Sequence, residues 1–429
     1  MREIAIDAIA AGGDGVGRDA GLVVFVPRTA PGDVVRARWA SSGRFARGAL
    51  VEVVRPAPDR VSPPCAHYRE DRCGGCQLQH LGLPAQHGAK RQLVADALAR
   101  IGRRTVDVAS VVPSPNAWRY RRKLTLALRR GADGAWIAGL HPYDAPGDVF
   151  ALRDCPITDE RVVGVWRDVM AASTLFPRDA DALRGAVRLL GDARDPNAPA
   201  AATFTLEGGA RWARADEFLA AVPGIAGLWW APDGGPRRLL RARGDAAAGA
   251  SFAQVNAGMA DRLHADVVAE LRAVRPASLV DAYAGTGDVA VALAGDGARV
   301  TAIELDGDAA ALAGERLAPF GGRVLAARVE DVLAGTLPAA AVLVNPPRTG
   351  LDAAAADVLE RAAAGAFGAP PDVVVYVSCN PATLARDLGR MPSYGVRGAT
   401  PYDMFPQTAH VETLVVLEPT TPDRHEVRT

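Results

Sequence analysis

The sequence predicts an α/β protein in which a C-terminal domain on a largely parallel sheet follows a small β-barrel and a mixed central region. Residues 1–57 hold short apolar segments separated by glycine and proline turns, and a proline-rich stretch, 56–65, ends them. From about residue 250, near-continuous apolar runs alternate with Ala-rich helical segments. Such runs are typical of parallel strands that helices cover on both faces. We therefore expect three domains, at residues 1–57, 58–248 and 249–429.

The composition is that of a soluble globular protein, since 49% of the 429 residues are hydrophobic and 23% are charged. The 49 basic residues balance 49 acidic ones. Net charge therefore does not attract a polyanion, and any nucleic-acid site must be a local patch. No uncharged apolar run reaches the roughly 18 residues of a membrane-spanning helix, and the N-terminus lacks the apolar core of a signal peptide. We expect a cytoplasmic protein without membrane contact.

Residues 1–57 predict about five short strands that close into a barrel. Basic and aromatic side chains are interspersed on the later strands: Arg36, Arg38, Trp39, Arg44, Phe45 and Arg47. Small barrels commonly use that combination to hold single-stranded nucleic acid. An ordinary solvated strand face accounts for the pattern equally well.

The central region has mixed signals. The stretch AKRQLVADALARIG (89–102) has the helical period, and WRYRRKLTLALRR (118–130) predicts a strongly basic strand. Residues 175–248 are interrupted by glycine and proline and show no assignable pattern.

Four of the five cysteines lie in this central region: Cys65, Cys73, Cys76 and Cys155. Disulfides are not expected in a cytoplasmic chain. The Cys-Gly-Gly-Cys core lets two thiolates reach one centre, and four thiolates suit either structural zinc or an iron–sulfur cluster. Spacing alone leaves zinc, a cluster and no metal open. A redox role for the Cys-x-x-Cys pair is less favoured, because the pair opens no thioredoxin-like βαβ unit.

The C-terminal domain carries a candidate nucleoside site. In LVDAYAGTGDVAVALA (279–294), a strand leads through a glycine turn into a helix, and Glu304 ends the next strand, where a ribose diol can bind. The third glycine of the dinucleotide fingerprint is absent. A nucleoside without phosphates, such as S-adenosylmethionine, therefore fits better than NAD. Tyr283 and Asn345 also follow strands, and ligands bind at that edge of a parallel sheet.

Cys379 follows a further strand, directly before Asn380-Pro381, which predicts the start of a helix. The helix dipole is expected to favour the thiolate. A buried packing role is the alternative. Glu412 follows His410 near the start of the last strand. A thiolate and a carboxylate beside a methyl donor suggest one reaction: addition to C6 of a pyrimidine, methylation of C5, and removal of the C5 proton by a base. The target base must leave its stack.

With these residues, the chain resembles the RNA uracil-C5 methyltransferase family over nearly its whole length. SCNPATLARDL is similar to the nucleophile motif, which implies that Cys379 attacks uracil, and DMFPQTAHVETLVVL is similar to the C-terminal motif, which implies that Glu412 is the base. SFAQVN (251–256) resembles the segment whose glutamine, here Gln254, contacts S-adenosylmethionine. The resemblance implies a Rossmann-like class I methyltransferase domain with further cofactor contacts from Tyr283, Glu304 and Asn345.

The same resemblance concerns the other two parts of the chain. The cysteine set Cys65, Cys73, Cys76 and Cys155 resembles that of members with a [4Fe–4S] cluster, and residues 1–57 resemble the TRAM domain, a small RNA-binding barrel. WRYRRKLTLAL resembles an RNA-facing basic strand, which implicates Arg121 and Arg122. The chain departs from many members in having Asn345 in place of aspartate and seven residues between Cys65 and Cys73.

The resemblance implies S-adenosylmethionine-dependent methylation of uridine C5 in RNA, in rRNA rather than tRNA. A monomer is expected, because the sequence shows no coiled-coil or dimer seam. Two alternatives remain. An amino-group methyltransferase also uses Asn-Pro-Pro, although such enzymes continue with an aromatic residue where this chain has Arg348. A non-catalytic RNA-binding protein on the same fold would not need Cys379 and Glu412.

Overall fold

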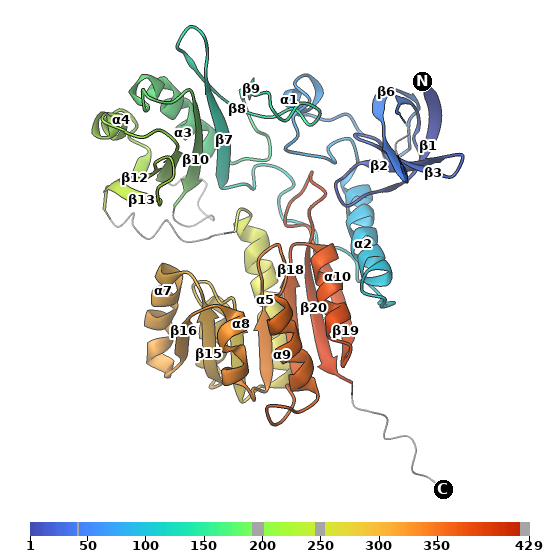
Figure 1. Cartoon of the computed structure of the whole chain (residues 1–429), viewed down its shortest axis with the longest axis vertical. Coiled ribbons are helices and arrows are strands. Elements are labelled where there is room, and N and C mark those ends of the chain that lie inside the picture. Colours follow the sequence, from blue (N-terminus) through green and yellow to red (C-terminus); the bar gives the residue numbers. More distant parts are fainter. Residues whose placement is uncertain (41–42, 191–200, 245–253, 421–429) are drawn as a thin grey trace.

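The computed structural model describes residues 1–40, 43–190, 201–244 and 254–420. These residues form three sheets (Figure 1). The N-terminal sheet and the central sheet lie side by side at one end of the molecule, and the C-terminal sheet forms the other end (Figure 1). In the described part of the chain, no helix is both long enough and apolar enough to cross a membrane.

The first sheet has the order β5-β3-β2-β1-β4-β6. Its strands are β1 (Arg2–Ile9), β2 (Gly15–Asp19), β3 (Leu22–Val26), β4 (Val34–Arg38), β5 (Phe45–Arg47) and β6 (Ala49–Arg55). Alternate residues such as Ile4, Val24 and Val35 are buried inside it. The sequence predicts about five strands, one fewer than this sheet contains. The shortest strand, the three-residue β5, pairs with β3 in parallel. The closed barrel and its assignment as a TRAM domain stay predictions.

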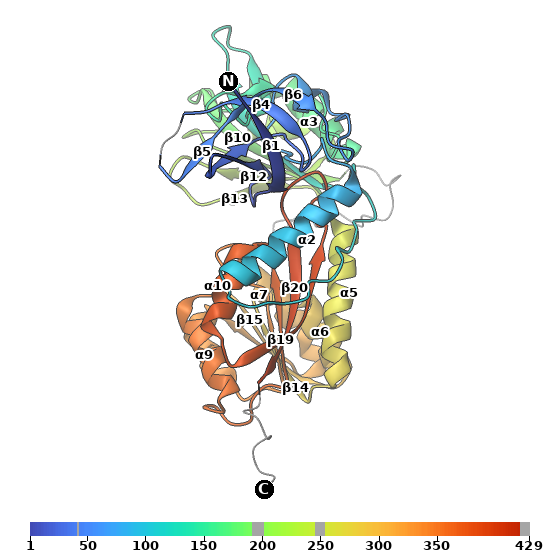
Figure 2. The same ribbon diagram turned by 90° about the vertical axis from the view of Figure 1, so that its right-hand side faces the viewer.

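The cysteine-bearing segment leads into two helices, α1 (Ala66–Arg69) and α2 (Leu83–Arg100). The helix predicted over residues 89–102 is confirmed as part of α2. It does not pack only within the central region. Val94 and Leu98 of α2 belong to the core of the C-terminal sheet, and α2 lies across the outer side of that sheet (Figure 2). The division at residues 57 and 248 stays a prediction.

The second sheet has the order β13-β12-β11-β10-β7-β8-β9. Its strands are β7 (Lys123–Arg130), β8 (Trp136–Leu140), β9 (Phe150–Ala151), β10 (Ala182–Leu189), β11 (Ala202–Glu207), β12 (Ile225–Ala231) and β13 (Arg238–Ala242), with α3 (Glu160–Ala171) and α4 (Ala215–Ala221). The basic strand predicted over 118–130 begins only at Lys123, because residues 118–122 contact other segments. Residues 175–248, which lacked a pattern, contain four of these strands.

The third sheet has the order β16-β15-β14-β17-β18-β20-β19. Its strands are β14 (Ser278–Ala282), β15 (Arg299–Glu304), β16 (Arg323–Ala326), β17 (Ala341–Val344), β18 (Val373–Ser378), β19 (Tyr394–Tyr402) and β20 (Glu412–Pro419). Helices α5 (Ala257–Val274), α6 (Asp288–Gly295), α7 (Gly307–Leu317), α8 (Val329–Val332), α9 (Ala353–Ala363) and α10 (Pro381–Arg390) accompany it. The predicted largely parallel sheet is confirmed for β14–β18, whereas β20 is antiparallel to both of its neighbours.

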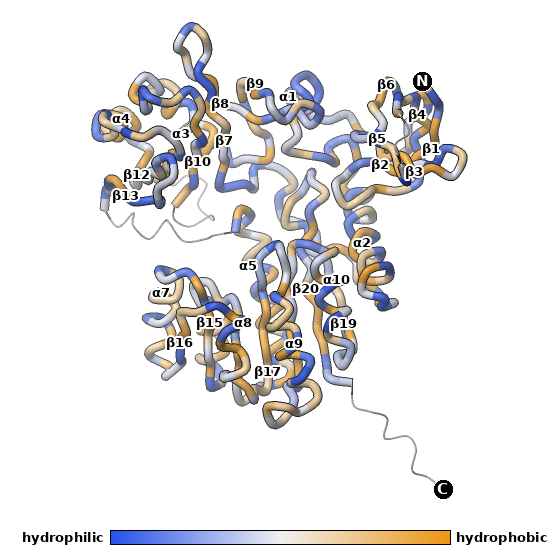
Figure 3. Tube along the Cα trace, viewed as in Figure 1, coloured by the Kyte–Doolittle hydropathy of each residue, from blue (hydrophilic) through white to orange (hydrophobic). Residues whose placement is uncertain are grey.

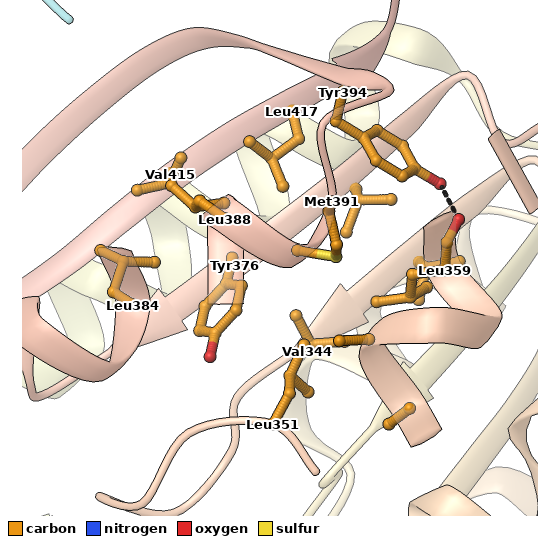
Figure 4. Close-up of a cluster of buried hydrophobic side chains, with 14 of the residues drawn as sticks. Val344, Leu351, Leu359, Tyr376, Leu384, Leu388, Met391, Tyr394, Val415 and Leu417 are labelled. Atoms are coloured by element: carbon orange, nitrogen blue, oxygen red, sulfur yellow. Dashed lines mark hydrogen bonds between the residues drawn. The ribbon is translucent and has the colours of Figure 1, made fainter. Parts of the chain in front are cut away.

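Apolar side chains form a core on each face of this sheet. The hydropathy trace shows the same alternation, with apolar strands inside and polar loops at the ends (Figure 3). On the α9/α10 face, Tyr376 and Met391 lie among aliphatic side chains, and the Tyr394 hydroxyl donates to the Leu359 carbonyl at 3.0 Å (Figure 4). This packing holds the strands in register, and their carboxyl ends form the edge where the candidate site lies.

Candidate active site

The ends of β14 and β17 line a pocket of about 50 Å3. Three of the four residues predicted to hold the cofactor line it: Gln254, Tyr283 and Asn345. Tyr283 has a left-handed backbone, with φ +67°, which turns the chain sharply after β14. Gly285 and Gly287 continue this turn with positive φ before α6 begins. The register brings Asn345 next to the end of β14, since its N–H donates to the Ala282 carbonyl.

Glu304, the predicted ribose ligand, supports the glycine turn. Its carboxylate accepts hydrogen bonds from the N–H groups of Gly285 and Asp306, both at 2.8 Å. It is not among the residues that line the pocket. The carboxylate therefore sits beside the turn and fixes its shape, with lone pairs left for a further donor.

Asp281, which lines the pocket and is buried, was not among the site residues predicted from the sequence. Burial raises its pKa to about 7, and the charges of Asp288 and Glu304 act in the same direction. Two carboxyl groups, those of Asp281 and Asp288, thus line one small pocket, an environment that suits the positive charge of a sulfonium group. An acidic residue inside an apolar run was the signal in the sequence.

The nucleophile candidate and the base candidate lie close together. In the antiparallel ladder of β18 and β20, Ser378, the last residue of β18, pairs with Thr413. Cys379 directly follows Ser378, and Glu412 directly precedes Thr413. The charge of Glu412 acts on the Cys379 thiol, so strand pairing brings the two groups near each other although they are 33 residues apart in the sequence.

Burial controls the protonation of both groups. Glu412 is 4% exposed, and burial raises its pKa to about 7. Burial also raises the pKa of the half-buried Cys379 thiol, the Glu412 charge adds to this, and Arg348 opposes it. Burial thus outweighs the groups that favour the thiolate, and the contribution of the helix dipole to the acidity of this thiol stays a prediction.

The helix start at Asn380-Pro381 is confirmed. Asn380 is the N-cap of α10, and its side chain accepts from the Ala382 N–H at 3.1 Å. The same helix holds the Asn-Pro-Pro-Arg loop, because Asn380 and Thr383 both donate to the Arg348 carbonyl. The buried Asp387 accepts from the Leu351 N–H at 2.8 Å. The loop that carries Asn345 and the helix that follows Cys379 are thus one unit.

The four remaining cysteines line a single cavity of about 300 Å3. Burial raises the pKa of Cys73 to about 11 and raises those of Cys76 and Cys155 as well, and the other cysteines add to each shift. In the part of the chain that the structure describes, no group of His, Cys, Asp and Glu side chains is close enough to hold a metal ion. Arg121 also lines the cavity, and its buried Nε has no hydrogen-bond partner among the described residues.

Arg121 and Arg122 lie between this cavity and the C-terminal domain. Arg121 lines the cavity, and its charge also lowers the pKa of His410. The backbone N–H of Arg122 donates to the Val255 carbonyl at 3.0 Å, next to Gln254. Arg122 also donates to the Leu190 carbonyl, so its side chain is anchored within the protein.

A second group of cations lies on the central sheet, and of these only Lys123 belongs to the basic strand predicted from the sequence. Lys123 of β7 faces Arg188 of β10 as a cross-strand pair. Burial and the charges of Arg188, Arg184 and Arg237 all lower the pKa of Lys123. Like charges directly opposite each other cost stability, which is typical of a surface that binds a polyanion. No signal in residues 175–248 of the sequence pointed to the three arginines.

Known proteins resemble this chain over nearly its whole length. A family model described as tRNA (Uracil-5-)-methyltransferase matches residues 320–420. An uncharacterized RNA methyltransferase of Thermosynechococcus vestitus is 32% identical over 97% of both chains. The 23S rRNA (uracil(1939)-C(5))-methyltransferase of Halomonas elongata is 32% identical over 97% of this chain and 89% of its own length.

The fold is that of a solved enzyme. The tRNA (uracil-54, C5)-methyltransferase of Pyrococcus abyssi, in complex with S-adenosyl-L-homocysteine, matches with a TM-score of 0.69 and 22% identity. The match covers 97% of this chain and all of the other. Since relatives more than 30% identical span almost the whole sequence, the chain belongs to the family of S-adenosylmethionine-dependent RNA uracil-C5 methyltransferases.

Proposed function

We propose that the enzyme methylates C5 of a uridine in rRNA through a covalent adduct, with Cys379 as nucleophile and Glu412 as base. The observation that carries this proposal is the pairing of Ser378 with Thr413, because Cys379 directly follows the first and Glu412 directly precedes the second. Cys379 thus follows the end of β18, and Glu412 begins β20. Val377 of β18 lines the same pocket as Gln254, Tyr283 and Asn345. The pKa of Glu412, about 7, suits a general base at neutral pH.

The proposed reaction has three steps. The Cys379 thiolate forms a bond to uracil C6, and the C5=C6 electron pair moves so that C5 becomes nucleophilic. S-adenosylmethionine supplies the methyl group that C5 takes. Glu412 then accepts the C5 proton, the C5–H pair restores the C5=C6 bond, and the C6–S pair returns to sulfur. Arg348 assists the first step, since its charge favours the thiolate of Cys379.

The choice of rRNA rests on similarity. The relative from Halomonas elongata is a 23S rRNA methyltransferase that covers almost the whole chain at 32% identity. The tRNA enzyme from Pyrococcus abyssi is only 22% identical. We also propose that a monomer is active, because one chain supplies the pocket, the thiol and the carboxylate.

The test is to mix the enzyme and S-adenosylmethionine with RNA that carries 5-fluorouridine, and to run a denaturing gel. Fluorine cannot leave as a proton, so the adduct is trapped after methyl transfer. We expect a covalent band with rRNA, and none with Cys379→Ala. Glu412→Gln is expected to retain the band while losing turnover on ordinary RNA. Glu418→Gln, on the same strand, is the matched control and should behave as the parent.

The outcome separates the alternatives. If methyl transfer to RNA proceeds without a band, and survives Cys379→Ala, an amino-group methyltransferase is the better explanation. If no methyl transfer occurs with any RNA, a non-catalytic RNA-binding role replaces the proposal. A band with tRNA and none with rRNA would overturn the choice of substrate.

We further propose that Cys65, Cys73, Cys76 and Cys155 hold a [4Fe–4S] cluster. Support comes from the chemistry of the donor set, four thiols around one cavity. A single zinc ion would need the same four sulfurs within about 2.3 Å of one point, and the resemblance of this cysteine set to that of family members with a cluster favours the cluster. Bound there, a cluster would cross-link the segments around residues 65–76 and 155, and methyl transfer itself requires no electron.

Anaerobic purification followed by iron, acid-labile sulfide and zinc analysis tests this assignment. We expect four irons and four sulfides per chain, with loss on a single Cys73→Ser substitution. One zinc per chain with no sulfide would overturn the cluster. The absence of any metal would overturn both a cluster and a zinc site.

For residues 1–57 we propose a TRAM-like barrel that contacts RNA. Phe45 is half exposed, and Arg47 lies beside it on β5 with its guanidinium over the Phe25 ring. Exposed aromatic and cationic groups on one strand suit unstacked bases and phosphates. Phe45→Ala is expected to weaken RNA binding while the adduct chemistry at saturating RNA is unchanged.

A further inference from the structure

The segment of residues 403–410, here called the base loop, connects β19 to Glu412 at the start of β20. Three side chains from distant parts of the chain hold its carbonyl groups. Lys90 Nζ donates to Phe405 at 3.0 Å, Tyr120 Oη donates to Pro406 at 3.0 Å, and Asn256 Nδ2 donates to Met404 at 3.1 Å. The base loop is therefore fixed from several sides and not by its own strand alone.

Gln407 is the centre of this arrangement. It is 3% exposed, and its backbone is left-handed with φ +70°, a conformation that residues other than glycine adopt rarely. Its N–H donates to Gln86 Oε1, and Gln86 Nε2 donates to Gln407 Oε1, both at 3.0 Å. Gln407 thus donates through its backbone N–H and accepts through its side chain, and this reciprocal, buried pair of hydrogen bonds with Gln86 ties the base loop to α2.

The carbonyl of Gln407 binds a different segment. It accepts from the N–H groups of Gln77, at 3.1 Å, and Leu78, at 2.9 Å. These two residues directly follow Cys76. The Gln77 side chain contacts both segments. Its Nε2 donates to the Gly74 carbonyl at 2.8 Å, and its Oε1 accepts from the Ala409 N–H of the base loop at 3.4 Å. The base loop is thereby joined to the Cys-Gly-Gly-Cys segment.

We propose that Gln407 is a positioning residue that presents Glu412 to the C5 proton of the target. It holds the base loop against α2 and against residues 77–78, and Glu412 follows only five positions later. This inference rests on the proposed covalent reaction. In the last step of that reaction, the C5 proton passes to Glu412, the C5–H electron pair forms the C5=C6 bond, and the C6–S pair returns to Cys379. Only this step needs the base.

A displaced Glu412 therefore has a distinctive consequence. Addition of Cys379 and methyl transfer still occur, but elimination slows, so the methylated adduct accumulates on ordinary uridine RNA. A residue that only supports folding would lower adduct formation and turnover together. The ratio of adduct to turnover thus separates positioning from general stability.

The test uses the full-length enzyme with two variants that break the same amide pair. Gln407→Gly keeps the left-handed backbone without strain, and Gln86→Leu removes the partner. We expect both to accumulate a methylated, denaturation-resistant adduct on ordinary RNA while turnover falls roughly tenfold to a hundredfold, as for a small displacement of a reacting group. With 5-fluorouridine RNA, both should form the adduct at the parental rate.

Gln92→Ala is the matched control, because Gln92 lies on the same helix and pairs only with Asp96 on its exposed side. It should match the parent in both assays. If Gln407→Gly does not fold, Gln407→Asn replaces it, since asparagine also tolerates the left-handed conformation.

Two results would overturn the inference: equal loss of adduct and turnover in both variants, or parental turnover in both. Failure of the proposed function looks different, because the parent itself would then form no adduct with 5-fluorouridine RNA.

Discussion

Single carboxyl and thiol groups in this enzyme owe their charge state to burial. Glu412 and Asp281 are both nearly inaccessible, and each has a pKa raised to about 7. Cys379 carries a raised pKa in spite of Arg348 and the start of α10. The identities of Cys379 and Glu412 were visible in the sequence motifs. Their protonation was not, because desolvation depends on what packs around them.

The raised pKa of Glu412 predicts a pH-dependent stability. A carboxyl with a usual pKa of 4.5 and a folded pKa of about 7 stabilises the fold fully below 4.5, and this contribution is lost as the pH rises through 7. Glu412→Gln removes the buried charge, so its Tm should exceed that of the parent increasingly between pH 5 and pH 8. Thermal unfolding across this range is the measurement. Glu418→Gln serves as control, and a Tm difference independent of pH would contradict the prediction.

Helix starts and turns that have a signal within a few residues of sequence were largely predictable. The Asn380-Pro381 start of α10 and the glycine turn after β14 both appear as expected. The basic strand was predicted five residues too early, because the N–H groups of Arg121 and Arg122 donate to the Ile157 and Val255 carbonyls and not to a neighbouring strand. Residues far away in the chain thus decided where β7 begins.

The loop between β17 and α9 offers a test of how elements are joined. Gly350 has φ +79°, and a Cβ there would lie 2.4 Å from Asp387 Oδ2, the atom that accepts from Leu351. Gly350→Ala should therefore lower the free energy of unfolding by about 1–3 kcal/mol and slow adduct formation, since Arg348 is displaced from Cys379. Gly307→Ala, in α7 with no atom within 4 Å, is the control. Equal stability of the two variants would show that the loop is not constrained.

The whole molecule is held together by contacts between segments that are far apart in the sequence. The helix α2 follows the cysteine segment yet packs on the C-terminal sheet. Its Lys90, which is fully buried, donates to Asp403 Oδ1 at 2.5 Å across 313 positions of sequence. His87 also contacts Asp403, at 3.0 Å. This polar cluster joins the central region to the base loop.

Breaking the buried pair should be costly. Lys90→Met leaves the Asp403 carboxylate without its main counter-charge, and loss of one partner of a buried ion pair typically costs about 3–5 kcal/mol. The double variant Lys90→Met/Asp403→Asn should be more stable than Lys90→Met alone, since no charge is then buried unpaired. Denaturant unfolding gives the free energy of unfolding of the parent and of both variants. A double variant that is no more stable than Lys90→Met would contradict the coupling.

The sequence by itself determined the α/β class of the C-terminal domain, the turn of the cofactor site, and the identities of Cys379, Glu412 and the four central cysteines. These signals are periodicities and motifs that span only a few residues. The tertiary fold was needed for the proximity of Cys379 and Glu412, the burial that raises their pKa values, the pairing of Lys123 with Arg188, and the hydrogen bonds of Gln407 to Gln77, Leu78 and Gln86. Each of these depends on strand register or packing between segments that are distant in the chain, and no local pattern encodes such partners.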